Sequence, residues 1–264
     1  MVTKQDVFAF LKEMGITKSD TVLVHSSMRS LGGVEGGCDG LIDAFKEYLS
    51  DGLFIVPAHT WDRVGGNTPQ FNVKTTMPCT GALCTVAVGR EDGVRSLHPT
   101  HSVVAFGKRA EQFVQGEENA HTPTPTGGVW DRLYDEKAKI LLIGIGHERN
   151  TYLHAVEERL DLPDCISESF FEAEITDKNG TVYKTKIHPH CGGRRSEKFR
   201  NYKPALDYFG AVQYSKLGEA LVYCCDAVKC TEVLTLLWQK ADYDLCAEIK
   251  EIPEWYYKGE KKGE

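Results

Sequence analysis

The sequence predicts an α/β fold in which a mixed, mostly parallel central sheet is covered by helices on both faces. Short apolar runs rich in β-branched residues alternate with amphipathic helical segments, which is typical of such folds. In the C-terminal third, alternating apolar and polar residues predict a small antiparallel subsheet. At 264 residues and 41% hydrophobic, the chain can bury a large core. We therefore expect a single domain over 1–264 that includes an antiparallel hairpin subregion at 165–225.

The strands and helices of the central sheet are expected in the first two thirds of the chain. The N-terminal segment predicts an amphipathic helix capped by Thr3. A second helix is expected in CDGLIDAFKEYLS, because Leu41, Ile42 and Phe45 share one face. The expected strands are the apolar runs TVLVHSS (21–27), LFIVPA (53–58), HSVVAFG (101–107) and KAKILLIGIG (137–146). Strands that are separated by helices favour βα units and parallel pairing.

After about residue 165 the pattern becomes that of hairpins. SESFFEAEITDKNGTVYKTKIHPH alternates on both sides of Asn179-Gly180, which predicts a β-hairpin with its turn there. A second short hairpin is expected around YSKLGEALVYCCD. AVKCTEVLTLLWQKAD then predicts an amphipathic helix with Asp226 as its cap.

Composition and charge exclude some classes of function. The net charge of −7 argues against nucleic acid as a partner, because a phosphate backbone requires a basic face. No apolar run approaches the ~20 residues that span a bilayer, and the N-terminus has no signal-peptide pattern. Nine scattered cysteines favour reduced thiols and a cytoplasmic location. We expect a monomer or homodimer that acts on a small molecule.

The first of three notable loops is VHSSMRSLGGVEGGCDG, residues 24–40, which joins a strand to a helix. Glycines let backbone N–H groups approach a ligand, serine hydroxyls add donors, and the following helix N-terminus favours anions. A phosphate-bearing cofactor would fit, although a flexible connection with turn glycines explains the composition equally well. The loop matches neither the Walker pattern nor the dinucleotide fingerprint.

The second loop, GVRSLHPTHSVVAFG at residues 93–107, carries His98 and His101 three positions apart. These histidines could line a pocket. A metal site would need a third ligand, and the chain has neither an HExxH motif nor a CxxC pair. His188, His190 and Cys191 form another cluster that could bind a metal, although exposed polar residues are the more common meaning of such a cluster.

The third loop follows the strand at 137–146 and leads into NTYLHAVEERL. Asn150 or Thr151 can cap this helix, so His154 falls in its first turn and Glu157 one turn later on the same face. The helix dipole favours a neutral imidazole, which can accept a proton, and a carboxylate beside it would stabilise the imidazolium. An ordinary capped helix with a satisfied core histidine has the same pattern.

In their order, TVLVHSSMRSLGGVEGG, RSLHPTHSVVAFG and KILLIGIGHERNTYLHAVE resemble the motifs of the aminoglycoside N3-acetyltransferase family. These antibiotic acetyltransferases are distinct in fold from the GNAT superfamily. The resemblance runs from about residue 3 to residue 160 and continues more loosely to about 240. It includes a T-x-x-H-x-x-E segment, here Thr151, His154 and Glu157.

The resemblance implies an acetyl-CoA-dependent N-acetyltransferase of aminoglycosides or related amines, which acts by direct attack with His154 as the general base. It implies catalytic roles for His154, Glu157 and Thr151. The expected cofactor-binding residues are His25, Ser26, Ser27, Leu31, Gly32, Gly33, Val34 and Ser96. The expected substrate-binding residues are His98, His101, Ser102, Asn150 and Trp61.

The sequence departs from the family where the acceptor should bind. HTPTPTGGVWDRL at 121–133 replaces a G-x-x-S-P-L segment, and Arg194, Arg195, Lys198 and Arg200 make a normally acidic stretch basic. We therefore expect a less acidic acceptor pocket. Two alternatives remain open: a metal-dependent hydrolase that uses His98, His101 and the cluster at 188–191, and a non-catalytic CoA-binding protein.

Overall fold

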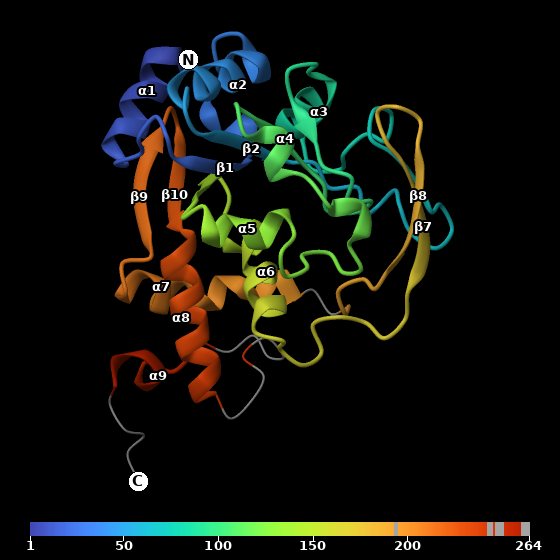
Figure 1. Ribbon diagram of the computed structural model, residues 1–264. Coiled ribbons are helices and arrows are strands. Elements are labelled where there is room, and N and C mark those ends of the chain that lie inside the picture. Colours follow the sequence, from blue (N-terminus) through green and yellow to red (C-terminus); the bar gives the residue numbers. More distant parts are fainter. Residues whose placement is uncertain (193–194, 242–244, 246–250, 260–264) are drawn as a thin grey trace.

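A seven-stranded mixed sheet forms the centre of the molecule (Figure 1). The computed structural model describes residues 1–192, 195–241, 245 and 251–259. In sheet order the strands are β4 (Val94–Arg95), β5 (Val103–Phe106), β2 (Leu53–Pro57), β1 (Thr21–Ser26), β6 (Lys139–Ile143), β10 (Ala220–Asp226) and β9 (Val212–Leu217). The α/β class and the four expected strands are thus confirmed.

The expectation that this sheet is mostly parallel is wrong. Only β1–β2 and β1–β6 pair in parallel, and the other four pairs are antiparallel. A strand buried on both faces has a continuous apolar run whichever way it is directed, so the run at 101–107 could not reveal that β5 returns beside β2. The expected second hairpin is β9–β10, and it extends the central sheet instead of joining a subsheet.

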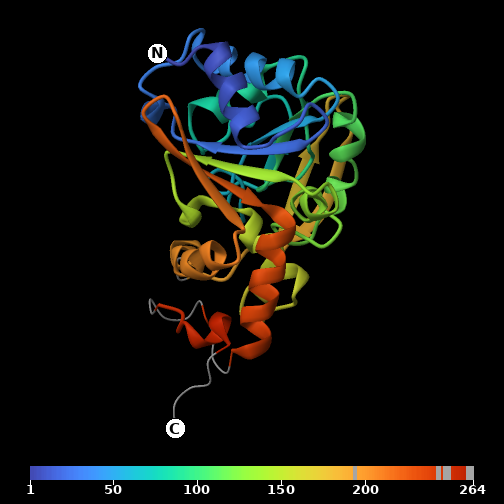
Figure 2. The ribbon, with the colours of Figure 1, turned by 90° about the vertical axis from the view of Figure 1, so that its left-hand side faces the viewer.

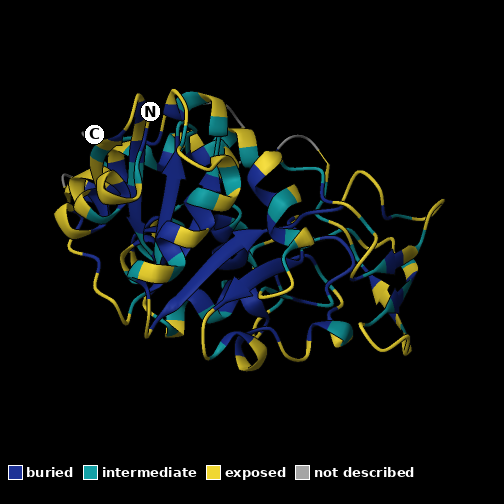
Figure 3. Cartoon of the chain, turned by 90° about the horizontal axis from the view of Figure 1, so that it is seen from above, coloured by how far each residue is buried: buried dark blue, intermediate teal, exposed yellow. Residues whose placement is uncertain are grey.

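Helices cover both faces of the sheet, as expected (Figure 2). One face packs against α1 (Lys4–Glu13), α2 (Gly37–Tyr48) and α3 (Ala82–Gly89). The other packs against α4 (Ala110–Phe113), α5 (Val129–Asp135), α6 (Tyr152–Arg159), α7 (Lys203–Tyr208), α8 (Ala227–Lys240) and α9 (Trp255–Lys258). Alternate residues of β1 enter the two cores. Val22 and Val24 pack on the face covered by α1, α2 and α3, and Leu23 packs on the opposite face. The central strands are buried along most of their length (Figure 3).

Two of the expected helix caps form. Thr3 and Asp6 make a reciprocal capping box at α1, and the Asp226 side chain accepts a hydrogen bond from the Lys229 N–H at α8. Short 3₁₀ segments connect other elements: η1 (Met28–Leu31), η2 (Glu117–Asn119), η3 (His147–Arg149) and η4 (Arg195–Tyr202). Within the described residues, no helix has the length and apolar character needed to cross a bilayer.

A smaller sheet stands beside the main one. The hairpin of β7 (Phe171–Thr176) and β8 (Val182–Ile187) is antiparallel and turns at Gly180, as expected. Its third strand, β3 (Gln70–Asn72), comes from the N-terminal third and pairs in parallel with β7, which the sequence did not predict. This sheet brings the segment that follows β8 towards α6, as the yellow-to-orange chain in Figure 1 shows.

Candidate active site

The candidate site lies where the three mutually parallel strands end. Their order is β2-β1-β6, so their carboxyl ends meet at one edge of the sheet. His25 and Ser26 end β1, His59 follows β2, and α6 follows β6. Because β5 is antiparallel to β2, its start also lies here, and the Ala58 N–H donates to the Ser102 carbonyl over 2.7 Å.

Glycine is required where β6 turns into this edge. Gly144 has a φ of 66°, and a Cβ built on it would lie 2.3 Å from the Ser30 Cβ. The turn leads through η3 into α6, which points His154 at the strand ends.

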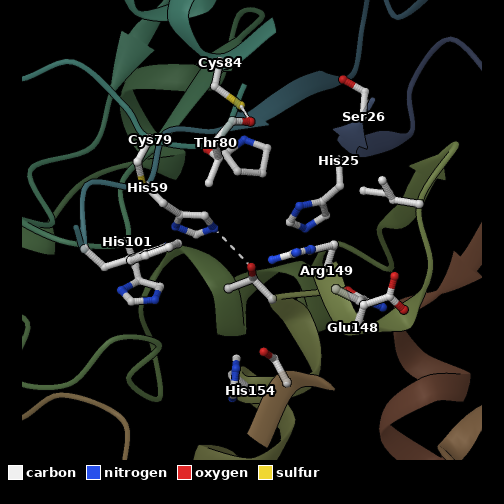
Figure 4. A pocket seen from close by; sticks show the side chains of 16 residues that line it. His25, Ser26, His59, Cys79, Thr80, Cys84, His101, Glu148, Arg149 and His154 are labelled. Atoms are coloured by element: carbon white, nitrogen blue, oxygen red, sulfur yellow. Dashed lines mark hydrogen bonds between the residues drawn. The ribbon is translucent and has the colours of Figure 1, made fainter. Parts of the chain in front are cut away.

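Two cavities adjoin at this edge. The β1-side cavity, about 420 Å³, is lined by residues that include His25, Ser26, His59, Asn150 and Thr151 (Figure 4). The β8-side cavity, about 480 Å³, lies toward the small sheet and is lined by residues that include Val64, Phe171, Ile187 and His190. Both are lined by Trp61, His101, His154 and Ser196. These four residues therefore form a common wall.

His154 belongs to a buried network of charges. Its Nδ1 lies 3.2 Å from Glu157 Oε2, and Arg195 Nε donates to Glu157 Oε1 over 2.9 Å. Burial alone would raise the pKa of Glu157, but the hydrogen bonds and charges of His154 and Arg195 outweigh it and hold the pKa below its ordinary value. Since an ionised carboxylate only accepts, His154 carries a proton on Nδ1 and presents Nε2 as an acceptor.

Thr151 is the N-cap residue of α6, but its side chain makes no cap hydrogen bond. The Thr151 hydroxyl lies 3.0 Å from His59 Nε2 instead, as the dashed line in Figure 4 marks. Thr151 is thus tied to the loop after β2 and faces the β1-side cavity.

Trp130 orders the histidines of this edge. Its ring stacks on His25 at 5.9 Å and on His59 at 5.3 Å between centroids, and its indole N–H donates to the His101 carbonyl. Burial lowers the pKa of His25 to about 3 and lowers that of His59 well below its ordinary value. Both imidazoles are therefore neutral near pH 7.

Several buried polar atoms around the β1-side cavity have no hydrogen-bond partner among the described residues. They are His25 Nε2, His59 Nδ1, Thr80 Oγ1 and the side-chain amide of Asn150. Buried polar groups normally find partners, so their convergence on one cavity indicates a ligand with donors and acceptors of its own. The amides of pantetheine and the carbonyl of a thioester fit this description, and Arg149 in the same lining can meet a phosphate.

The structure brings together only part of the expected site. Residues that line one or both cavities are His25, Ser26, Trp61, His101, Asn150, Thr151 and His154. Glu157 lines neither cavity but contacts His154, which lines both. The remaining residues have local contacts elsewhere. Ser27 accepts a hydrogen bond from the Ser30 hydroxyl, Leu31 lies in the core, and Val34 bridges to Val2. Gly32 and Gly33 lie in the same turn, where Gly33 accepts from the Val2 N–H.

Three expected site residues of the loop at 93–107 form hydrogen bonds within that loop and to neighbouring backbone. Ser96 Oγ accepts from the Val103 N–H, and the Ser102 hydroxyl donates to the Ala58 carbonyl. His98 Nδ1 accepts from the N–H groups of Thr100 and His101, so its Nε2 donates to the Thr122 carbonyl. Their expected roles in binding stay predictions.

These contacts do not support the metal-dependent hydrolase. Both ring nitrogens of His98 are engaged, His188 Nδ1 contacts the Ser167 carbonyl, and His190 Nε2 contacts Glu158. Among the described residues, no three His, Cys, Asp or Glu side chains are grouped to hold a metal ion. Arg194, part of the expected basic stretch, lies outside the described residues.

Sequence reasoning did not single out His59, Glu158 and the pairing of Arg195 with Glu157. His59 could have been found, because it follows the buried run at 53–58 in the way that the other loops follow their strands. Arg195 lies 38 residues from Glu157 and His190 lies 32 residues from Glu158, and no local pattern indicates these two pairings.

Comparison with known proteins identifies the family. The family model described as aminoglycoside 3-N-acetyltransferase matches residues 23–238. The SPbeta prophage-derived aminoglycoside N(3')-acetyltransferase-like protein YokD of Bacillus subtilis is 29% identical over 242 residues, which cover 83% of this chain and 85% of that protein. Aminoglycoside N(3)-acetyltransferase IV of a Salmonella species is 29% identical over 161 residues, 61% of this chain and 60% of that enzyme.

The fold agrees with solved structures. Aminoglycoside acetyltransferase AAC(3)-IIb superposes with a TM-score of 0.78 at 22% identity, over 91% of this chain and 98% of its own. The AAC-IIIb binary complex with CoASH superposes with a TM-score of 0.77 at 20% identity, over 92% of this chain and 98% of its own. The resemblance noted in the sequence is confirmed, and the chain belongs to the aminoglycoside 3-N-acetyltransferase family.

Proposed function

We propose that the protein transfers an acetyl group from acetyl-CoA to an amine by direct attack, with His154 as the general base. The observation that carries this is the position of His154 in the common wall, in reach of both cavities and with Nδ1 held by Glu157. A base that serves a two-substrate transfer must reach the place where the two substrates meet.

The β1-side cavity is the proposed site of the acetyl donor. Its unpartnered polar atoms suit the amides of the cofactor, and the complex of AAC-IIIb with CoASH on the same fold supports the assignment. Acetyl-CoA supplies the acetyl group as an activated thioester. His25 and Ser26 bind from the end of β1, and Asn150 and Thr151 supply donors where negative charge develops on the carbonyl oxygen.

The β8-side cavity is the proposed site of the acceptor. AAC(3)-IVa has been solved in complex with a gentamicin, which makes an aminoglycoside or a related amine the first candidate for this chain. Within the described residues, however, no aspartate or glutamate lines this cavity, whereas Val64, Phe171 and Ile187 do. An amine with few charges and an apolar body therefore fits better than a polycation.

His154 Nε2 takes the proton that the amine nitrogen loses as the new N–C bond forms. Glu157 fixes the tautomer and stabilises the resulting imidazolium, while Arg195 keeps Glu157 ionised. His154 then returns the proton to the departing sulfur. No covalent enzyme intermediate is required, so the scheme uses none of the cysteines.

The test is release of free thiol from acetyl-CoA by the whole protein, with aminoglycosides, simple amines and amino-sugar conjugates as acceptors. Amine-dependent release, with the acetylated product found by mass spectrometry, is the expected result. Binding of acetyl-CoA without thiol release across the panel would instead indicate a non-catalytic CoA-binding protein.

A further inference from the structure

Two consecutive glutamates of α6 each hold a histidine of the acceptor cavity. Glu157 holds His154, and Glu158 Oε1 lies 3.1 Å from His190 Nε2. The two imidazoles stack, with centroids 4.1 Å apart and an interplanar angle of 24°. His190 comes from the segment after β8 and lines the β8-side cavity together with His154. The proposed function uses only one of these two pairs.

Glu158 is a buried carboxylate. Burial would raise its pKa, but hydrogen bonds from His190, Thr122 and Thr124 and the charge of His190 together hold it below its ordinary value. The Thr122 hydroxyl donates over 2.5 Å, and the Thr124 N–H and hydroxyl donate over 2.9 and 2.6 Å. Because an ionised carboxylate only accepts, His190 carries its proton on Nε2 and presents Nδ1 as an acceptor.

The charge balance of the two pairs differs. Arg195 compensates Glu157, whereas within the described part of the chain no lysine or arginine forms an ion pair with Glu158. A buried carboxylate whose ion-pair partner among the described residues is a histidine, charged only when it is protonated, favours a cation close by. The ammonium group of an acceptor amine, hydrogen-bonded to His190 Nδ1, would be such a cation.

Acetyl transfer to an ammonium ion needs two proton acceptors. The ammonium nitrogen carries three hydrogens and the amide product carries one, so two protons leave it in each turnover. One ends on the sulfur of the departing thiol, and the other goes to solvent. His154 accounts for the first of these.

We propose that His190, held by Glu158, is a second catalytic base that deprotonates the ammonium form of the acceptor before attack. This inference rests on the proposed acetyl transfer. His190 takes one proton and holds it while the neutral amine nitrogen attacks the acetyl carbon. His190 then passes that proton to solvent, the C–S bond breaks, and His154 carries the second proton from the nitrogen to the sulfur.

The stacking of the rings sets the order of these steps. Two imidazolium ions with centroids 4.1 Å apart repel each other, so only one of the two rings is in the charged imidazolium form at a time. Burial and the charge of His154 lower the pKa of His190 to about 4, against the opposing effect of Glu158. His190 therefore releases its proton before His154 becomes charged.

The groups that face His190 come from several elements. Glu157, Glu158 and His154 lie on α6, and His59 and His101 lie on the loops at the end of β2 and the start of β5. Arg195 of η4 and Cys191, the residue after His190, line the same cavity as His190. The glutamates favour a proton on His190, whereas Arg195 and any charged neighbouring histidine oppose it.

The experiment compares benzylamine, which is protonated at pH 7, with benzohydrazide, which has a similar aromatic body and is already neutral. An alkylamine with a pKa of about 10 exists as free amine in only about one molecule in a thousand at pH 7. A variant that lacks the second base can use only that fraction. His190→Gln should lower kcat/KM for benzylamine on the order of 100-fold at pH 7 and change that for benzohydrazide less than about twofold.

The pH profile adds a second measurement. The benzylamine deficit of His190→Gln should shrink about tenfold with each pH unit as free amine accumulates, until the pH reaches the pKa of the amine. Glu158→Gln should reproduce the deficit. In calorimetry without acetyl-CoA, Glu158→Gln should also bind benzylamine more weakly than the wild type at pH 7, because it lacks the charge that attracts the ammonium ion.

Controls separate this proposal from the function on which it rests. His154→Ala should slow both acceptors alike, and His188→Gln, two residues from His190 and bonded to the Ser167 carbonyl, should slow neither. Equal losses for both acceptors in a folded His190→Gln protein, or no loss for benzylamine, would overturn the second base. Failure of the wild type to acetylate either compound would overturn this inference, and failure with every acceptor of the panel would overturn the proposed function as well.

Discussion

Glu157 gives the two ring nitrogens of His154 different tasks. Nδ1 is held by a carboxylate that Arg195 keeps ionised, and in the proposed function Nε2 exchanges a proton with substrate. The site is built from such single contacts, and the role of each can be tested one side chain at a time.

Removing the base should affect turnover and spare cofactor binding. General-base catalysis is typically worth ~10²–10⁴-fold, so His154→Ala should lower kcat by about that factor and leave the Kd of acetyl-CoA nearly unchanged. Glu157→Gln should cost less, because it keeps the shape and removes only the charge. Steady-state kinetics and calorimetry measure the two effects. Wild-type turnover by His154→Ala, or loss of activity through unfolding alone, would contradict the assignment.

Two adjacent serines make a matched pair for the cofactor site. Ser26 lines the β1-side cavity, whereas Ser27 is bonded to Ser30. Ser26→Leu should therefore weaken acetyl-CoA binding at least tenfold with little change in Tm, because a larger side chain fills the cavity. Ser27→Leu should mainly lower Tm through crowding of its turn. Calorimetry and thermal melts of both variants distinguish these outcomes; equal loss of affinity would disprove the assignment.

At the scale of elements, the β8-side cavity depends on chain segments that are remote in sequence. The loop at 61–66 meets there the β7–β8 hairpin and the start of η4, which lie more than 100 residues further along the chain. The apolar runs at 21–27, 53–58 and 137–146 predicted the strands that position His25, His59 and His154. The same reasoning could not predict β3 beside β7, or His190 against Glu158, because such contacts depend on where the hairpin docks.

The apolar lining of this cavity predicts poor use of polycationic acceptors. We expect kcat/KM for gentamicin to fall below the usual enzyme range of ~10⁴–10⁸ M⁻¹s⁻¹. Trp61 is half exposed in the common wall, so Trp61→Glu adds a negative charge that should lower the KM for gentamicin severalfold relative to Trp61→Gln. A wild-type value inside the usual range would contradict this prediction.

Over the whole molecule, buried neutral histidines link stability to pH. Burial lowers the pKa of His25 to about 3 and that of His147 to about 4, from an ordinary value of 6.5. For His98 burial outweighs the hydrogen bond to Thr122 and also lowers the pKa to about 4. As the pH falls below 6.5, these histidines therefore bind protons in the unfolded chain that they do not bind in the folded protein.

The sign of this linkage is fixed by the direction of the pKa shifts. The stability that these histidines contribute is fully present above pH 6.5 and is lost as the pH falls towards 4. Each can cost up to about 1.4 kcal/mol per pH unit in that window. Urea denaturation from pH 7 to pH 4.5 should show the loss. His147→Phe should reduce the slope of the unfolding free energy against pH by the contribution of one proton taken up on unfolding. An unchanged slope in a folded His147→Phe protein would contradict it.

The common wall has a consequence for ligand design. Because the cavities proposed for donor and acceptor adjoin at His154, both substrates should be bound at once, and the kinetics should follow a sequential scheme with intersecting reciprocal plots. A bisubstrate compound that joins the sulfur of coenzyme A to an arylalkylamine through a short linker should span the wall. It should bind at least 10²-fold more tightly than either half, since the second half meets its cavity at a high effective concentration.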